Sequence, residues 1–281
     1  MPITVDGPPD QPTISQSLIP PSVYLDHWAI RLFSDNHRLQ DRLVRTLARK
    51  RGTLVLSHIS LWEFARPPDA RHCAAAERFL ERLLPDIYFT DFRFDLVISQ
   101  ERTHPGNIWR ATPTEYRQLV EYFVTFGKER AGQLTMEGFL QTGHAHRERT
   151  LQKLTKTLAA LRRGLERARG RSEYVRKARS VQPSPERTRT MIVFGELLRN
   201  YFLDPAARLS DNDLIDFTHA AMPVNCCDYV LLDAKWANLV HKLKQRIESS
   251  GHVMPIAKCF SRRDDGIEAF LLDLANYDIW R

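Results

Sequence analysis

Two short apolar runs in this sequence each end in an aspartate, although roughly two hundred residues separate them. The run 23–25 leads into Asp26, and the run 229–232 leads into Asp233. Continuous apolar runs of this length are typical of buried parallel strands. Because open α/β sheets bind their ligands beyond the carboxyl ends of the strands, both acids are candidates for a binding site.

Two further acids fall in segments that have the pattern of helix starts, Glu63 in 57–63 and Asp216 in 211–216. If one sheet gathers all four carboxylates, they form the hard-oxygen ligand set that Mg²⁺ or Mn²⁺ prefers. Such ions polarise a phosphate and lower the pKa of a bound water. The pattern therefore predicts metal-assisted hydrolysis of a phosphodiester.

Each of these acids also has a structural alternative. An aspartate that directly follows a strand, as Asp26 and Asp233 do, can cap the next helix. Glu63 lies three residues after Ser60, which matches a capping box, and a glutamate turned back to its own helix terminus is not free to bind a metal. Asp228, just before the second run, is predicted to be a turn residue.

The segment 210–219 offers more than one ligand candidate. Asp213 lies three residues after Ser210 and could stabilise a helix start through the helix dipole. Asp213 and Asp216 share a helix face, so both could face one site, and Asp216 is the better candidate because capping does not explain it. His219 could orient a phosphate or a carboxylate, although a structural, hydrogen-bonded histidine is the more frequent role.

Composition narrows the classes of protein that fit. The chain has 281 residues, 43% of them hydrophobic, which suffices for one large domain or two. We expect a cytoplasmic protein, because no apolar run approaches the ~18 residues of a membrane span and no secretory signal begins the chain. The four cysteines show no zinc-type spacing and are expected to be buried thiols. A net charge of +7 permits a polyanionic partner.

The order of elements predicts an α/β fold. A strand at 53–56 follows a helix and precedes the segment of Glu63, and strand–helix alternation favours a parallel sheet. Residues 1–21, rich in proline, are expected to be a flexible lead-in. The remaining chain, 22–281, is expected to be one domain that is split as 22–68 and 205–281 around a mainly helical insertion at about 69–204.

Within the insertion, helices are expected at 74–84, 114–126 and 150–169, and weak strand patterns occur at 87–90 and 96–98. After it, helices are expected at 213–222 and 234–247, a strand near 253–256 and an amphipathic stretch at 267–274.

The insertion is also rich in arginine between 147 and 189. Leucines recur there at helical spacing, so one face should pack while the basic residues face outward. A basic helix face attracts phosphate backbones without reading their sequence, although a solvated surface helix is the simpler alternative. The predicted RNA-binding residues are Arg162, Arg163, Arg167, Arg169 and Arg171.

Taken together, the motifs Tyr24-Leu25-Asp26, Ser60-x-x-Glu63, 213–221 and Val230-Leu231-Leu232-Asp233 resemble, in this order, those of the PIN-domain nucleases. The resemblance covers about 22–68 and 205–281. It implies a Rossmann-like sheet, a Mg²⁺ or Mn²⁺ site and cleavage of single-stranded RNA to a 5′-phosphate and a 3′-hydroxyl. It makes Asp26, Glu63, Asp216 and Asp233 the ligands, with Asp213 as a fifth candidate.

The chain departs from the family in two ways. The insertion has no counterpart in the toxin-type members, which are about half as long. A leucine, Leu231, stands where a Thr or Ser two residues before the final Asp is common.

The sequence thus favours a metal-dependent endoribonuclease, with a toxin or defence role suggested by analogy alone. An antitoxin or inhibitor protein and a homodimer are the partners that the analogy adds. One alternative is a non-catalytic RNA-binding protein whose acids are helix caps. The other is a DNA nuclease or phosphatase that uses a divalent ion. The absence of a glycine-rich phosphate loop and of a G-x-S-x-G elbow argues against nucleotide-binding ATPases and serine hydrolases.

Overall fold

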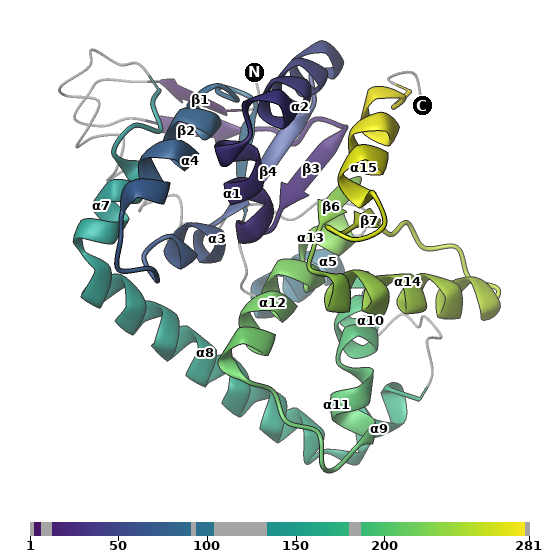
Figure 1. Ribbon diagram of the computed structural model, residues 1–281. Helices are drawn as coiled ribbons and strands as arrows, with labels where there is room; N and C mark the ends of the chain where they lie inside the picture. Colours follow the sequence, from purple (N-terminus) through teal and green to yellow (C-terminus); the bar gives the residue numbers. More distant parts are fainter. Residues whose placement is uncertain (1–2, 7–12, 91–93, 104–133, 180–186, 279–281) are drawn as a thin grey trace.

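A five-stranded parallel sheet forms the centre of the protein (Figure 1). The computed structural model describes residues 3–6, 13–90, 94–103, 134–179 and 187–278. Its strands lie in the order β5-β4-β3-β6-β7. Their bounds are β3 (Ser22–Leu25), β4 (Thr53–Ser57), β5 (Ile87–Thr90), β6 (Tyr229–Leu231) and β7 (Lys258–Phe260). The predicted α/β fold with a parallel sheet flanked by helices is confirmed.

Both faces of the sheet are apolar because helices cover both. Successive side chains of a strand point to opposite faces, so Val23 and Leu25 join one core cluster and Tyr24 joins the other. The first cluster is completed by α1 (His27–Asp35), α2 (His37–Lys50), α4 (Arg71–Glu81) and α15 (Gly266–Ala275). The second is completed by α8 (Arg147–Arg169), α10 (Arg189–Leu197), α12 (Asp211–Ala221) and α14 (Ala234–Ser249).

The region around 96–177 is mainly helical, as predicted. Its long helix α8, along the lower left edge of Figure 1, buries Leu154, Leu158 and Leu165, which confirms the predicted packing face. The helix predicted at 114–126 lies outside the described residues. The remaining short helices are α3 (His58–Glu63), α5 (Phe94–Thr103), α7 (Phe139–Ala145), α9 (Ser172–Lys177), α11 (Arg199–Leu203) and α13 (Pro223–Cys226).

Two strand predictions inside the insertion had opposite outcomes. The pattern at 87–90 is strand β5, which pairs with β4 in a register that places Ile87 opposite Leu54, so the sheet takes an edge strand from the expected insertion. The pattern at 96–98 lies in α5, and the strand prediction there is wrong. Val97 is buried against Met222 while the residues around it are more exposed, so only one side of this segment packs. The division of the chain at 69 and 204 stays a prediction.

The amino-terminal segment contains regular structure that its sequence did not indicate. Strands β1 (Ile3–Asp6) and β2 (Thr13–Gln16) pair antiparallel, and Ile3 is buried in the first core cluster. The side chain of Gln16 accepts from the backbone N–H of Phe89 at 2.7 Å and donates to its carbonyl at 3.2 Å. The described residues of this segment therefore contact distant parts of the chain, and the flexibility expected for 1–21 stays a prediction.

The carboxyl-terminal elements follow their predictions closely. The expected helices 213–222 and 234–247 are α12 and α14, and the stretch 267–274 lies in α15. The expected strand at 253–256 is displaced by a few residues, to β7. Within the described ranges, no helix has both the length and the apolar character that crossing a bilayer requires.

Asp228 ties the first residue of β3 to the start of β6. Its Oδ2 accepts from the backbone N–H and the hydroxyl of Ser22 at 2.7 and 2.8 Å, and its own N–H donates to the Ser22 carbonyl. Ser22 is buried, so its N–H depends on this acceptor. Asp228 thus joins two strands as well as preceding one.

We predict that Asp228→Ala lowers the free energy of unfolding by about 1–3 kcal/mol, because it leaves the buried N–H of Ser22 without an acceptor. Urea denaturation measures the change. The control Glu248→Gln removes a charge from the exposed side of α14 and should alter stability by less than about 0.5 kcal/mol. Equal losses in the two variants would contradict this role for Asp228.

Candidate acidic site

The sheet has a topological switch point between β3 and β6. The chain runs from β3 through β4 to β5 on one side, and then returns to place β6 and β7 on the other. Asp26 and Asp233 follow the two strands that meet at this point, and the N–H of Asp26 donates to the Leu231 carbonyl at 3.1 Å. This is the position at which open α/β sheets bind ligands.

Three side chains from different parts of the chain converge beside this edge. One potential ligand atom from each of Asp26, Glu63 and His219 lies within 4.8 Å of the other two. Nε2 of His219 is 2.6 Å from Oε2 of Glu63 and 3.9 Å from Oδ1 of Asp26. The three residues are 6%, 7% and 0% exposed. Two carboxylates and an imidazole are a donor set consistent with a divalent metal ion.

The capping box proposed as an alternative for Glu63 does not form. The N–H of Ser60 donates to the hydroxyl of Ser57, not to the carboxylate of Glu63. The Ser60 hydroxyl contacts the hydroxyls of Ser57 and Tyr24. Glu63 points to His219 and lies 3.6 Å from Arg66. Asp26, by contrast, does cap α1, because one of its oxygens accepts from the His27 N–H at 2.6 Å.

A buried hydrogen-bond network holds His219 from the side away from Glu63. The hydroxyl of Tyr24 lies 2.5 Å from Nδ1 of His219, 2.9 Å from the Ser60 hydroxyl and 3.3 Å from that of Ser57. Tyr24 comes from β3, the serines from the junction of β4 and α3, and His219 from α12. Because both ring nitrogens are engaged, the orientation of the imidazole is fixed.

The electrostatics of Glu63 and His219 are those of an ion pair. Burial alone would lower the pKa of His219, but Tyr24, Asp26 and Glu63 outweigh it and hold the pKa well above its ordinary value. Burial works to raise the pKa of Glu63, yet the charge of His219 and their hydrogen bond bring it below its ordinary value. His219 therefore neutralises one carboxylate of the cluster.

His219 offsets the charges of Asp26 and Asp216 less, since it lies 3.9 Å from Asp26 and forms no ion pair with Asp216 among the described residues. Burial, with the charges of Glu63 and Asp233, raises the pKa of Asp26 to about 6, although His219 opposes the shift. Burial and the charges of Asp26 and Asp233 raise the pKa of Asp216 to about 7. The raised pKa values mean that the surroundings of these two carboxylates disfavour their ionised forms. A bound cation would supply the positive charge that the surroundings lack.

The two remaining candidates have structural roles as well. Asp233 caps α14 by accepting from the Trp236 N–H at 2.9 Å, and its charge still acts on Asp26 and Asp216. Asp213 forms a full capping box with Ser210 and an ion pair with Lys235. Asp213 is thus held by other groups. Of the predicted ligands, only Asp26 and Glu63 belong to the three-residue cluster, and Asp213, Asp216 and Asp233 lie outside it.

No family model, curated protein or solved structure matches this chain. The chemistry of the site and of the surface around it therefore carries the functional conclusion.

A cavity of about 620 Å³ is lined mainly by residues of α1, the helix that Asp26 caps. Its lining includes His27 and Trp28, which directly follow Asp26, the basic residues Arg31 and Arg262, and the acidic residue Asp35. The Arg262 guanidinium lies 5.1 Å from the centre of the Trp28 ring. An aromatic ring beside two arginines suits a ligand with both phosphates and bases.

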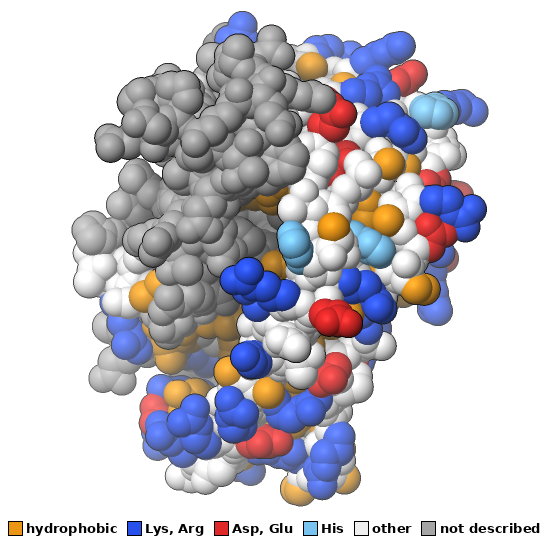
Figure 2. Space-filling view, turned by 90° about the vertical axis from the view of Figure 1, so that its left-hand side faces the viewer, with side chains coloured by type: hydrophobic (Ala, Val, Ile, Leu, Met, Phe, Trp, Pro, Cys, Tyr) orange, Lys and Arg blue, Asp and Glu red, His pale blue; other side chains and the backbone are white. Residues whose placement is uncertain are grey.

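The five arginines predicted to bind RNA fall into two groups. Arg162 pairs with Asp211 at 2.7 Å, and Arg169 donates to the carbonyls of Ala207 and Asp204 while stacking on a tyrosine, so both secure the segment that leads into α12. The exposed members are Arg163, Arg167 and Arg171. Lysine and arginine side chains gather on the lower part of the face drawn in Figure 2.

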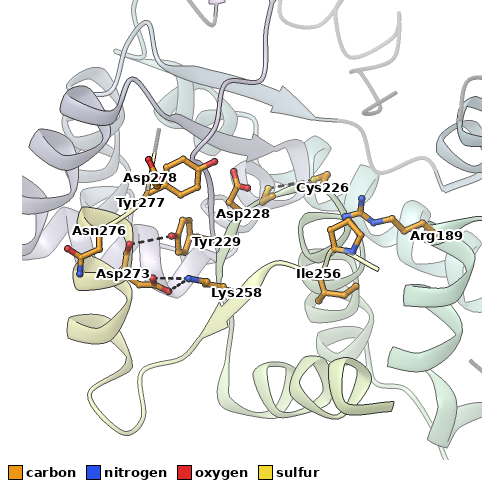
Figure 3. Close-up of a pocket in the computed structure, with 12 residues that line it drawn as sticks. Arg189, Cys226, Asp228, Tyr229, Ile256, Lys258, Asp273, Asn276, Tyr277 and Asp278 are labelled. Atoms are coloured by element: carbon orange, nitrogen blue, oxygen red, sulfur yellow. Dashed lines mark hydrogen bonds and ion pairs between the residues drawn. The ribbon is translucent and has the colours of Figure 1, made fainter. Parts of the chain in front are cut away.

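Another hollow, of about 560 Å³, lies at the opposite edge of the sheet and contains none of the predicted site residues (Figure 3). Two of its charged groups satisfy one another. Lys258 pairs with Asp273 at 2.8 Å, and the Tyr229 hydroxyl donates to the Asp273 carbonyl at 3.3 Å. Cys226 and Cys227 also line it, and the four cysteines of the chain are free.

Sequence reasoning did not identify the network that orients His219. Tyr24, Ser57 and Ser60 lie within apolar or capping patterns, and nothing in their spacing indicates that they share one partner. The sequence offers His219 as an orienting residue, one helical turn after Asp216, although a structural role is the more frequent one for such a histidine. Its position on the face of Asp216 was the one available signal.

We predict that Mn²⁺ stabilises the protein more at about pH 8 than at about pH 5.5. The raised pKa values of Asp26 and Asp216, about 6 and about 7, mean that both take up protons as the pH falls through this window. These protonations stabilise the metal-free fold at low pH and compete with the ion. The midpoint of thermal unfolding with and without millimolar MnCl₂ measures the effect. An equal or larger Mn²⁺ increment at the lower pH would contradict it.

Proposed function

We propose that this protein is a metal-dependent endoribonuclease with a PIN-like domain and that it uses Mg²⁺ or Mn²⁺. The observation that carries the proposal is the convergence of Asp26 and Glu63, with the charges of Asp216 and Asp233, at the switch point of a parallel sheet. The order of these acids along the chain supports the PIN-like assignment.

In this proposal Asp26, Asp216 and Asp233 hold the ion, with Glu63 beside them. A bound divalent ion supplies the polarisation of a phosphate and lowers the pKa of a water. His219 keeps Glu63 in place through its 2.6 Å contact and is itself held by Tyr24. Asp213 is left outside the ligand set because Ser210 and Lys235 engage its carboxylate.

The surroundings of the site favour a nucleic acid over a small phosphate ester. The cavity along α1 offers Trp28 for stacking and two arginines for phosphates, and the protein carries a net charge of +7. Single-stranded RNA is the proposed substrate, and a 5′-phosphate and a 3′-hydroxyl are the proposed ends. A toxin or defence setting, with an inhibitor protein as partner, extends the proposal by analogy.

We predict that Asp26→Asn and Asp216→Asn each lower Mn²⁺-dependent cleavage of labelled single-stranded RNA by at least about a hundredfold. Each change removes a negative charge that the ion needs while keeping the size of the side chain. The control Asp273→Asn alters an acid at the opposite edge of the sheet and should retain activity within about threefold. Full activity in both site variants would contradict a role for these acids in holding the ion.

The same assay separates the rival functions. A non-catalytic RNA-binding protein would bind the labelled RNA without cleaving it in Mn²⁺. A DNA nuclease would prefer duplex DNA, and a phosphatase would hydrolyse a phosphomonoester faster than either nucleic acid. Preference for single-stranded RNA is the result expected from the proposal.

We further predict that Arg262→Ala weakens RNA binding and reduces the slope of log affinity against log salt by about one, because one phosphate contact is lost. Its neighbour Arg263 is exposed and does not line the cavity, so Arg263→Ala is the matched control. Filter binding across a salt series in the presence of Ca²⁺ measures both variants. Identical slopes for the two would place the RNA elsewhere.

A further inference from the structure

The helical region encloses a cavity of about 720 Å³ that is separate from the acidic cluster. It lies among α5, α8, α9, α10 and α11, and its lining is mostly apolar. The larger apolar side chains include Phe94, Leu161, Leu165, Met191, Phe194 and Phe202. A volume of this size is typical of sites for small organic ligands.

The charged residues that line this cavity are all cationic. They are Arg167, Lys177 and Arg187, and no aspartate or glutamate is among the described residues of the lining. Lys177 pairs with Glu173 outside the cavity, and Arg167 donates to a backbone carbonyl of its own helix. The Arg187 guanidinium lies beside Gly195 in α10, and the charge of Glu196 in the same helix also acts on it. An apolar chamber with positive charge is complementary to an apolar anion.

We propose that this cavity binds an amphipathic monoanion, a compound with an aliphatic body and one carboxylate, as in a medium-chain fatty acid. Burial of the aliphatic body removes apolar surface from water, and the cations receive the carboxylate. A nucleotide fits the lining less well, because its base needs several polar partners. The lining offers few uncharged polar groups, and the hydroxyl of one of them, Thr218, already donates to a carbonyl at 2.6 Å.

The cavity adjoins the two helices that carry the acidic cluster. Its lining includes Ile59, one turn before Glu63 on α3, and Thr218, which precedes His219 on α12. An occupant therefore contacts helices that position the acids, although the proposal for this cavity does not depend on the nuclease activity.

Gly164 provides a direct test of the cavity. It lies within α8 and lines the cavity, and a Cβ added there meets no atom within 4 Å. The substitution Gly164→Leu would fill the chamber while placing a better helix former in α8. Gly143, in α7, has equally open surroundings and does not line the cavity, so Gly143→Leu is the matched control.

Isothermal titration of the full chain with decanoate tests the proposal. We expect saturable binding that Gly164→Leu weakens by at least about tenfold and Gly143→Leu leaves within about twofold. Circular dichroism verifies that both variants are folded. Absence of decanoate binding, or binding that Gly164→Leu does not weaken, would overturn the proposal.

A second pair of variants tests the charge and stays informative if Gly164→Leu fails to fold. The double substitution Arg167→Ala with Lys177→Ala should weaken decanoate by about fivefold or more and leave the uncharged decanol unaffected. Equal effects on the two ligands would refute an anion site. Uridine monophosphate is the third ligand, and displacement of decanoate by it at lower concentration would identify a nucleotide site instead.

Discussion

The candidate site depends on the parallel pairing of β3 with β6. These strands are separated by about two hundred residues of chain, yet their register places Leu25 opposite Leu231 and brings Asp26 and Asp233 to one edge. Asp228 and Ser22 hold the other end of the same pair. A shift of the pairing by one residue would reverse the faces to which the side chains point and separate the acids from the helices that complete the site.

The pairing also creates an electrostatic cost that the fold only partly offsets. Four carboxylates act on one another near the switch point, and the buried His219 pairs most closely with Glu63 and offsets the charges of Asp26 and Asp216 only in part. The raised pKa values of Asp26 and Asp216 reflect the burial and the repulsion between carboxylates that His219 does not offset. A protein that needed these residues only as caps would gain nothing from bringing them together. Clusters of acids with perturbed pKa values are typical of sites that bind a cation or move a proton.

The sequence was sufficient for features that are local. The apolar runs before Asp26 and Asp233 fixed two strands, and strand–helix alternation predicted the parallel sheet. The sequence was insufficient for side chains whose partners lie far away in the chain. Gln16 is held by the backbone of Phe89, a contact that local sequence does not indicate. Glu63 matches a capping box in the sequence, but in the structure its carboxylate binds His219, 156 positions away in the chain. The hydrogen bonds of Tyr24 likewise depend on side chains from three elements.

Anomalous diffraction from crystals of this protein soaked in MnCl₂, recorded at the manganese absorption edge, tests the central claim most directly. The account predicts a peak beside the carboxylates of Asp26 and Asp216, and its loss in crystals of Asp26→Asn. Peaks confined to other parts of the surface, with the acidic cluster empty, would contradict a cation site at the switch point of the sheet.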